Sequence, residues 1–286
     1  MADQNKSAKP RGGKLDLATI AGLVIALGGI IGGLLIEGGK IQDILQFTAA
    51  LIVLGGTFGA VLVSTPLRTV TAGLGRLKSV VLDGAVPMDD LIEEIIGYAT
   101  KARKNGLVSL EDEALLIKDP FLRKALNLAV DGTDLHEIRK MLELEMDLGE
   151  QQAEAEAKVF ETAGGYAPTV GIIGAVMGLI QVMKNLANID EVGHGIAVAF
   201  VATVYGVGLA NLLLLPAASK IKARAQAETQ RKELILESVS GIVEGLNPKL
   251  IRAKIEAYVQ RLPAKHKKAQ DQKSRSSPAG AVTEEA

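Results

Sequence analysis

Apolar residues gather in four segments that contain no Asp, Glu, Lys or Arg: residues 17–36, 44–67, 162–183 and 195–219. A helix of roughly 20 apolar residues is needed to cross the hydrocarbon core of a bilayer, and each segment meets that length. A buried helix of a soluble protein would explain one such segment, but four in one chain favour membrane spans. The pattern therefore predicts an all-α membrane protein with four transmembrane helices.

Between the second and third spans, apolar residues recur three and four positions apart, which is the period of an amphipathic helix. The clearest apolar face comprises Leu91, Ile92, Ile95, Ile96, Ala99 and Ala102. Gly106 supplies a helix stop, and Ser109 and then Thr133 or Asp134 are expected as helix N-caps. We therefore expect a helical domain inserted between spans 2 and 3.

The third and fourth apolar segments have no helix stop on the side facing the polar parts of the chain. An apolar stripe with three- and four-residue spacing runs from Leu135 to Phe160 and leads directly into the third span. A similar face continues the fourth span as far as Leu246. We expect both spans to extend out of the membrane as long helices, which could carry movement across its boundary.

Basic residues set the orientation, because positively charged loops stay in the cytoplasm. Of the 32 Lys and Arg residues, the turns at 37–43 and 184–194 hold one each, whereas residues 68–161 hold twelve. Both termini and the inserted domain are therefore predicted to be cytoplasmic. The expected organisation is a tail (1–14), a transmembrane hairpin (15–67), a cytoplasmic helical domain (68–161), a second hairpin (162–219), a cytoplasmic helix region (220–261) and a disordered tail (262–286).

Composition narrows the function further. The net charge of −1 argues against nucleic acid as a partner, and the absence of cysteine excludes disulfides and thiol chemistry. The first apolar segment is too long, and lies too far inside the chain, for the core of a cleaved signal peptide. We predict no enzyme activity, no catalytic residue, no metal site and no cofactor.

The spans themselves carry no carboxylate or amine, although membrane carriers and pumps usually keep one in the bilayer. The remaining polar candidates are Thr169, Gln181, Thr203, Tyr205 and Asn211. Hydroxyls can line an ion path, but they do not hold a proton at neutral pH. Either the protein conducts nothing, or another chain packed against it supplies the carboxylate.

Small residues and prolines point to helix contacts and hinges. Pairs of small residues four apart, such as Gly28 with Gly32 and Gly174 with Gly178, let helix backbones meet. For the first span, packing within one subunit and contact with another chain are equally good explanations. For the third span, we expect the glycines to leave a thin face for a foreign helix. Pro168 and Pro216 fall at the same expected depth and are predicted to be a pair of hinges.

Several stretches resemble the A-subunit of the bacterial flagellar stator, the MotA family. They are GGYAPTVGIIGAVMGLI, GIAVAFVATVYGVGLANLLLLPAASKIK, DPFLRKALNLAVDGTD and GLNP, and the resemblance covers about residues 15 to 260. It implies a ring, with five copies, around a single-span peptidoglycan-binding B-subunit (MotB-type) that supplies a membrane aspartate. It also implies that ion flow past that aspartate turns the ring against the rotor switch protein (FliG-type). The bacterial inner membrane is the implied location.

The resemblance carries over to particular residues. Pro168 and Pro216 match the family's two functional prolines, and Thr203 matches the threonine that faces the ion site. Arg103 and Glu111 match the charged pair that engages the rotor. A structural salt bridge is an alternative role for Arg103, and a favourable charge in a first helical turn is one for Glu111.

The identity of the coupling ion can be inferred from the residues at two positions. Sodium-type relatives tend to carry threonine at the positions of Ala175 and Ala202, and alanine offers no side-chain oxygen to sodium. Protons are therefore expected. Together with Thr203 and Tyr205, these two positions make up the predicted ion pathway. An energiser of an outer-membrane system (TolQ or ExbB type) and a non-conducting membrane scaffold are the competing interpretations.

Overall fold

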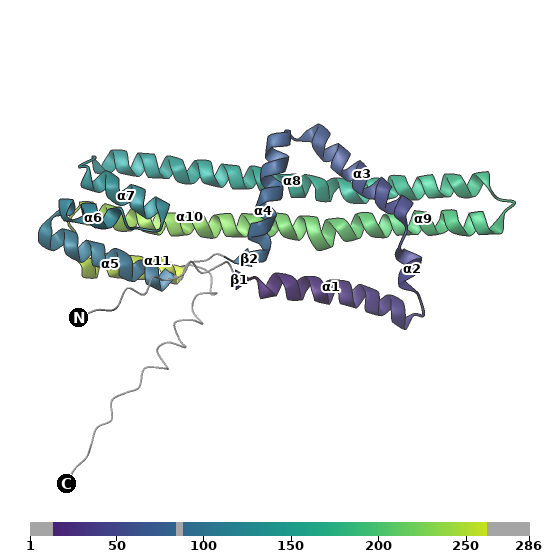
Figure 1. Cartoon of the computed structure of the whole chain (residues 1–286), viewed down its shortest axis with the longest axis horizontal. Helices are drawn as coiled ribbons and strands as arrows, with labels where there is room; N and C mark the ends of the chain where they lie inside the picture. Colours follow the sequence, from purple (N-terminus) through teal and green to yellow (C-terminus); the bar gives the residue numbers. More distant parts are fainter. Residues whose placement is uncertain (1–13, 84–87, 262–286) are drawn as a thin grey trace, which may run out of the picture. The chain divides into compact units, whose positions relative to one another are not determined.

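The computed structural model describes residues 14–83 and 88–261, which are almost entirely helical (Figure 1). Residues 1–13 and the tail 262–286, which the sequence predicts to be disordered, lie outside the described residues. The chain divides into two compact units. We call the described residues within 1–85 and 145–229 the span unit, and those within 86–144 and 230–261 the insert unit.

The first half of the span unit contains β1 (Lys14–Leu15), α1 (Leu17–Ile36), α2 (Ile41–Ile44), α3 (Phe47–Ser64), α4 (Leu67–Val81) and β2 (Leu82–Asp83). The two strands form a two-stranded antiparallel pair, with Leu15 opposite Leu82. The second half contains the end of α8 (Leu135–Lys184), α9 (Ile189–Gly208), the π-helical segment η2 (Leu209–Leu214) and the start of α10 (Leu215–Val243).

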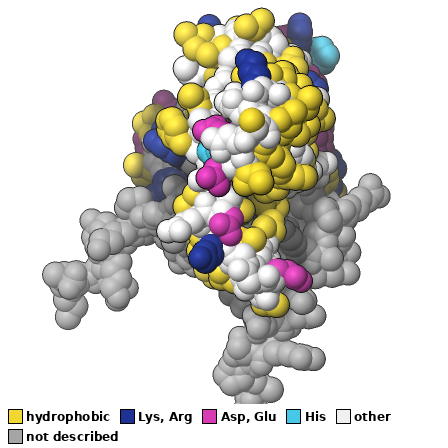
Figure 2. Space-filling view, turned by 90° about the vertical axis from the view of Figure 1, so that its right-hand side faces the viewer, with side chains coloured by type: hydrophobic (Ala, Val, Ile, Leu, Met, Phe, Trp, Pro, Cys, Tyr) yellow, Lys and Arg dark blue, Asp and Glu magenta, His cyan; other side chains and the backbone are white. Residues whose placement is uncertain are grey.

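Within residues 14–83 and 88–261, four helical stretches are long and apolar enough to cross a membrane: Leu17–Ile36, Ile41–Ser64, Leu135–Lys184 and Ile189–Val243. The last two have 50 and 55 residues, much more than a bilayer requires. The predictions of four spans and of two spans extended as long helices are therefore confirmed. On the face seen in Figure 2, hydrophobic side chains predominate and charged ones are scattered among them.

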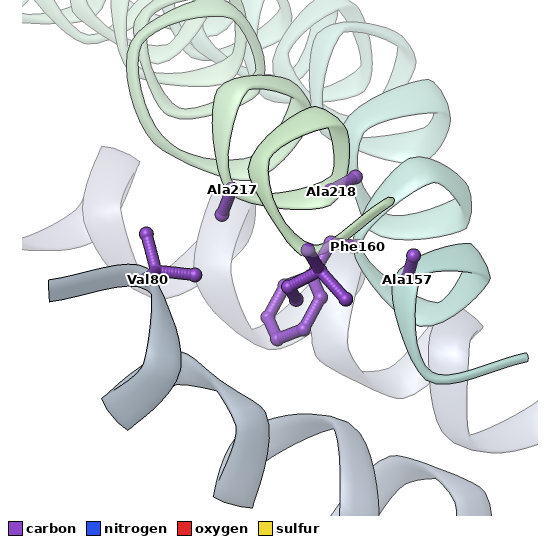
Figure 3. Packing of buried hydrophobic residues seen from close by; sticks show 6 residues of the cluster. Val80, Ala157, Phe160, Ala217 and Ala218 are labelled. Carbon is purple, nitrogen blue, oxygen red and sulfur yellow. The ribbon is translucent and has the colours of Figure 1, made fainter. Parts of the chain in front are cut away.

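The core of the span unit is built largely from small side chains. Figure 3 shows Ala157 and Phe160 of α8 gathered with Ala217 and Ala218 of α10 and Val80 of α4. Phe160 is the only aromatic ring in this cluster, and the alanines around it let the helix backbones come close. The cluster holds α4 against the segments of α8 and α10 that adjoin the third and fourth spans.

The insert unit contains α5 (Met88–Asn105), the short 3₁₀ helix η1 (Leu107–Leu110), α6 (Glu111–Ala114), α7 (Pro120–Val130), the start of α8, the end of α10 and α11 (Pro248–Arg261). Its core is conventional and apolar, with Ile95, Leu110, Leu122, Leu126, Ile138, Leu142, Ile235 and Ile251 almost fully buried. The predicted face of α5 is buried except for Ile96, which is half-buried.

The helix ends of the insert unit follow the local chemistry of the sequence. Asp134 accepts a hydrogen bond from the backbone N–H of His136 at 2.8 Å, which makes it the cap that the sequence left open between Thr133 and Asp134. Gly106 has a φ of +84°, as a glycine helix stop requires. The prediction for Ser109 is wrong, because its hydroxyl donates to the carbonyl of Gly106 inside a 3₁₀ turn.

The two compact units do not follow the predicted boundaries of the cytoplasmic domain. That domain was expected over 68–161, but α4 and residues 145–161 belong to the span unit. The reason is packing, because Val70 lies in one cluster with Val159 and Ala163 of α8. The predicted ranges state which residues lie on the cytoplasmic side of the membrane, and that assignment stays a prediction.

Candidate functional site

Glycine sets how closely α8 and α9, which run side by side in Figure 1, approach each other. A Cβ built on Gly206 would lie 2.5 Å from the carbonyl oxygen of Ala167. One built on Gly171 would lie 2.8 Å from the carbonyl oxygen of Ala202. No side chain fits at such distances from a backbone, so the crossing of these two helices depends on glycine at both positions.

The expectation that the glycines of the third span leave a face for a foreign helix is wrong for three of them. Gly171, Gly174 and Gly178 are all buried, and each faces α9 of the same chain. Gly174 also meets Ile52 of α3. These glycines therefore build the subunit, and a helix from another chain must contact other positions of α8. Gly165 is one glycine of this span that has no atom within 4 Å of a built Cβ.

Thr203 lies at the same crossing. Its Cα is 3.5 Å from the Cβ built on Gly171, and its side chain is half-buried. The hydroxyl donates a hydrogen bond to the carbonyl of Ala199, one turn earlier in α9, at 3.2 Å. That bond uses its only proton and leaves the oxygen lone pairs available to an incoming donor or cation.

The two alanines of the predicted ion pathway are in different surroundings. Ala202 is completely buried, in a cluster that includes Ala49 and Val53 of α3. The Cβ built on Gly174 would lie 2.8 Å from the Cβ of Ala202, so this position is filled within the subunit. Ala175 follows Gly174 in α8 and is half-buried.

Tyr205 is not brought together with Thr203. Its hydroxyl donates to the carbonyl of Ile44 and accepts from the backbone N–H of Gln46 at 3.3 Å, which attaches α9 to the connection between α2 and α3. Residues two apart in an α-helix differ by about 200° around its axis. Thr203 and Tyr205 therefore face nearly opposite sides of α9, although the sequence prediction grouped them.

Sequence reasoning missed Thr57, in the middle of α3. Its side chain is 1% exposed, and its hydroxyl has no hydrogen-bond partner among the described residues. Val53 and Val61, one turn away on either side, pack against α9 and α8 respectively, so Thr57 lies where α3 crosses that pair. The sequence did contain a signal, because Val53, Thr57 and Val61 are spaced four residues apart and the middle residue of this buried series is polar.

The two prolines have different backbone surroundings. Pro168 lies inside α8 without ending it, whereas Pro216 is the second residue of α10, one residue beyond η2, where the backbone has π-helical bonding. Because proline lacks an N–H, neither residue can donate a backbone hydrogen bond to the preceding turn of its helix. Leu215, next to Pro216, meets Gly164, one turn before Pro168. The prolines are therefore about one turn apart in depth rather than level.

Charged groups cluster where α1 begins. Asp16 caps α1 by accepting from the backbone N–H of Ala18 at 3.1 Å. The same carboxylate pairs with Lys220 and, at 3.0 Å, with Arg224, both on α10. Donation by Lys220, supported by Thr19 and Arg224, holds the pKa of Asp16 well below its usual range. This cluster fixes one end of α1 to α10.

A second charged contact holds α4 against α8. The carboxylate of Glu156 is buried and accepts from Arg76 at 2.5 Å and from the amide of Gln152 at 2.9 Å. Gly73 lies one turn before Arg76, and a Cβ built on it would be 3.1 Å from the carbonyl oxygen of Glu156. Partnered donors on both carboxylate oxygens are what allow this acid to be buried.

Arg103 and Glu111 lie in the insert unit, at the end of α5 and the start of α6. Both are exposed, and neither has an ion-pair partner within residues 88–261 or 14–83. Lys101 and Glu113, which do pair at 2.8 Å, connect the two helices beside them. The salt-bridge alternative for Arg103 therefore has no support in the described part of the chain, while Glu111 does occupy a first helical turn.

No group of three or more His, Cys, Asp or Glu that could hold a metal ion occurs among the described residues. The polar atoms near the α8–α9 crossing are hydroxyls and backbone carbonyls.

Comparison with known proteins decides between the candidate families. The profile of the MotA/TolQ/ExbB proton channel family matches residues 113–234, and that of the motility protein A N-terminal region matches residues 20–105. Motility protein A of Helicobacter pylori is 35% identical over 90% of this chain and 99% of its own. The chain belongs to the motility protein A family. The N-terminal motility protein A profile covers most of α1 and all of α3, the first two spans.

Solved structures agree with this family. The MotAB structure from C. jejuni matches with a TM-score of 0.82 and 33% identity, over 87% of this chain and 98% of the other. The flagellar MotAB stator complex from Bacillus subtilis matches with a TM-score of 0.80 and 32% identity, over 88% and 98%. As a MotA family member, the protein is a subunit of a flagellar stator.

Proposed function

We propose that this MotA-type subunit forms an ion path only together with a second chain that supplies a membrane carboxylate. The observation that carries the proposal is the pairing of Thr203, a half-buried hydroxyl at the α8–α9 crossing, with four spans that contain no Asp, Glu, Lys or Arg. Charge transfer through a bilayer requires an ionisable group. A single-span MotB-type B-subunit with an aspartate in its helix provides it.

The partner helix and further copies of this chain occupy surfaces that the subunit leaves exposed. Large apolar side chains on the outward side of α8 and α9 support this: Ile173, Met177, Phe200 and Val204 are each more than half exposed. Such surfaces suit lipid and helix packing. The assembly is a ring, with five copies around the B-subunits as the family resemblance implies, in the bacterial inner membrane with both termini in the cytoplasm.

The coupling ion is the proton. Sodium requires several oxygen ligands, and neither Ala175 nor Ala202 supplies one from its side chain. Ala202 is, in addition, fully buried between α3 and α8. A proton needs only the partner's carboxylate and water. Thr203 then accepts a hydrogen bond from that carboxyl group when the group is protonated, and Tyr205 acts from the far side of α9 by holding the α2–α3 connection.

Conversion of ion flow into movement involves the prolines and the insert unit. Pro168 and Pro216 loosen α8 and the α9–α10 run where a backbone bond is missing, which makes them hinges. Arg103 and Glu111, exposed and unpaired among the described residues, engage the rotor switch protein (FliG-type). The role is that of an ion-driven motor subunit rather than an enzyme.

Proton flux in liposomes tests this function. The purified chain alone should be closed to protons, and co-assembly with its B-subunit should open a path that is measured with a pH-sensitive dye. Thr203→Ala should lower that flux. Thr169→Ala is the matched control, because Thr169 is exposed and its hydroxyl also bonds its own helix, at the carbonyl of Tyr166. Flux through the chain alone, or equal effects of both substitutions, would contradict the proposal.

A further inference from the structure

The helix α4 lies at the level where the charge-free parts of α8 and α10 end. The charge-free segment of α8 begins at residue 162, and the one that enters α10 ends at residue 219. The residues that α4 packs against fall on both sides of these two boundaries: Ala157, Val159, Phe160, Ala163, Ala217, Ala218 and Ile221. The contacts therefore place α4 where the chain passes from apolar to charged surroundings.

The direction of α4 is that of a helix on a membrane surface. In Figure 1 it runs across α8 and α10 at a steep angle to both. Only Thr65 and Pro66 separate it from α3, which belongs to the second candidate span. A helix that crosses the spans at one of their ends, directly after another span, lies along the surface of the bilayer and not through it.

The outer side of α4 is a stripe of exposed residues. Their spacing of four, three, four and three residues keeps all of them within about 80° around the helix axis. The members of this outer stripe are Leu67, Thr71, Leu74, Lys78 and Val81. Gly73, Arg76 and Val80 lie on the opposite side, against α8 and α10. The outer stripe is therefore apolar surface that the subunit itself does not cover.

The charge of α4 has one sign. Residues 67–81 contain Arg68, Arg76 and Lys78 but no Asp or Glu. Arg76 faces inward and pairs with Glu156 at 2.5 Å. Arg68, beside the outer stripe, and Lys78, within it, are exposed and have no ion-pair partner among the described residues. Exposed cations next to apolar side chains, on a helix without acids, are typical of helices that bind anionic membrane surfaces.

We propose that the outer stripe of α4, with Arg68 beside it, binds anionic phospholipids of the cytoplasmic leaflet. Arg68 and Lys78 pair with the lipid phosphates, while Leu67 and Leu74 enter the boundary with the acyl chains. Ten residues of α-helix rise about 15 Å, so the two cations contact different lipid molecules. The ion pair between Arg76 and Glu156 holds α4 against α8, which connects the bound lipids to the third span.

The test uses the full chain assembled with its B-subunit, purified in a neutral detergent. The complex is titrated with phosphatidylglycerol or phosphatidylcholine, and native mass spectrometry counts the bound lipids. A cation near an anionic lipid surface contributes about fivefold to affinity. Arg68→Gln with Lys78→Gln should therefore lower the affinity for phosphatidylglycerol about fivefold at each site, with phosphatidylcholine binding unchanged. High salt should reduce the difference between the two lipids.

Two further variants separate charge from apolar contact. Lys140→Gln with Lys249→Gln is the matched control, because both lysines are exposed in the insert unit and have no ion-pair partner among the described residues. This variant has the same change in net charge and should bind phosphatidylglycerol as the unsubstituted complex does. Leu67→Ser with Leu74→Ser should weaken the binding of both lipids equally, since acyl chains do not depend on the headgroup.

Several results would overturn the lipid surface. They are an unsubstituted complex without preference for phosphatidylglycerol, an unchanged preference in the Arg68 and Lys78 variant, and an equal loss in the control. Displacement of the lipid by inorganic phosphate would make this an anion site, and failure of ring assembly in gel filtration would make the stripe a contact between copies. Proton flux plays no part in these measurements, so a chain that conducts nothing would contradict the proposed function alone.

Discussion

Two apolar helices of the span unit, α8 and α1, carry glycines at helix-contact spacing, yet their surroundings differ. In α8, Gly171 and Gly178 meet the backbone of α9. In α1, Gly28 and Gly32 have no atom within 4 Å of a built Cβ, and none of the 20 residues of the helix is buried. The same spacing thus completes the fold of the subunit in one helix and leaves a bare surface in the other. Small-residue spacing identifies a contact face but not the chain that fills it.

The largest effect is expected from adding a side chain at the α8–α9 crossing. Gly206→Val would force a branched side chain against the carbonyl of Ala167 and should abolish a stable subunit, because overpacking a fixed backbone contact costs about 1–3 kcal/mol or more. Gly29→Val in α1 should leave the thermal stability of the solubilised subunit unchanged. Melting and gel filtration in detergent measure both. Equal loss of stability in the two variants would remove the distinction between these helices.

A medium effect is expected where α3 crosses the α8–α9 pair. Thr57→Val keeps the shape of the side chain and removes a buried hydroxyl that has no partner among the described residues, so it should raise stability by about 1–3 kcal/mol. The reverse change one turn earlier, Val53→Thr, should lower it. Thermal melting of both variants checks the sign. A destabilised Thr57→Val variant would show that the hydroxyl is bonded in the native protein.

A smaller effect is expected at the anchor of α1. Asp16→Ala removes a helix cap and the pairing with Lys220 and Arg224, and the loss of a cap costs about 0.5–2 kcal/mol. Because the pKa of Asp16 is lowered in the folded protein, its contribution is present above the usual carboxyl pKa. It should stay constant from about pH 5 to 8 and decline only in more acidic solution. Asp16→Asn should flatten that acid decline in a pH series of melting curves.

The smallest effect on folding is expected in the insert unit. Arg103→Glu combined with Glu111→Lys changes two exposed side chains that have no ion-pair partner among the described residues. Stability and ring assembly should therefore be unchanged, while torque, measured from the rotation of tethered cells, should fall. Failure of assembly in this variant would mean that the pair supports the structure, and unchanged torque would remove it from the rotor contact.

Much of the fold could be predicted because a membrane span can be recognised from its long apolar, charge-free composition. Four charge-free segments, helical periodicity and a few caps were enough for the span count, the long extensions of α8 and α10, and the buried face of α5. The cap at Ser109 was wrong because Ser109 lies inside a 3₁₀ turn, whose hydrogen bonding a pattern of residue types does not reveal.

The candidate site was predicted in part. Thr203 and Ala202 lie at the α8–α9 crossing, and their part in an ion path stays a prediction. Tyr205 is on the other side of α9, since sequence proximity within a helix does not fix direction. Thr57 was overlooked because a threonine among valines resembles any other β-branched residue of a span. Its isolation from hydrogen-bond partners appears only when three helices are assembled around it.

The sequence by itself determined that this protein crosses a membrane four times and carries no acid or amine within those crossings. Charged side chains are costly in hydrocarbon, so the spans can be recognised from residue type alone. The tertiary structure decided which glycines of the apolar helices are covered by a neighbouring helix. Gly171, Gly174 and Gly178 of α8 face α9, the glycines of α1 face nothing in the subunit, and Leu115 and Leu116 are exposed. Contacts of this kind depend on where distant helices meet in space. Residue spacing along one helix defines a contact face but does not identify the helix that packs against it.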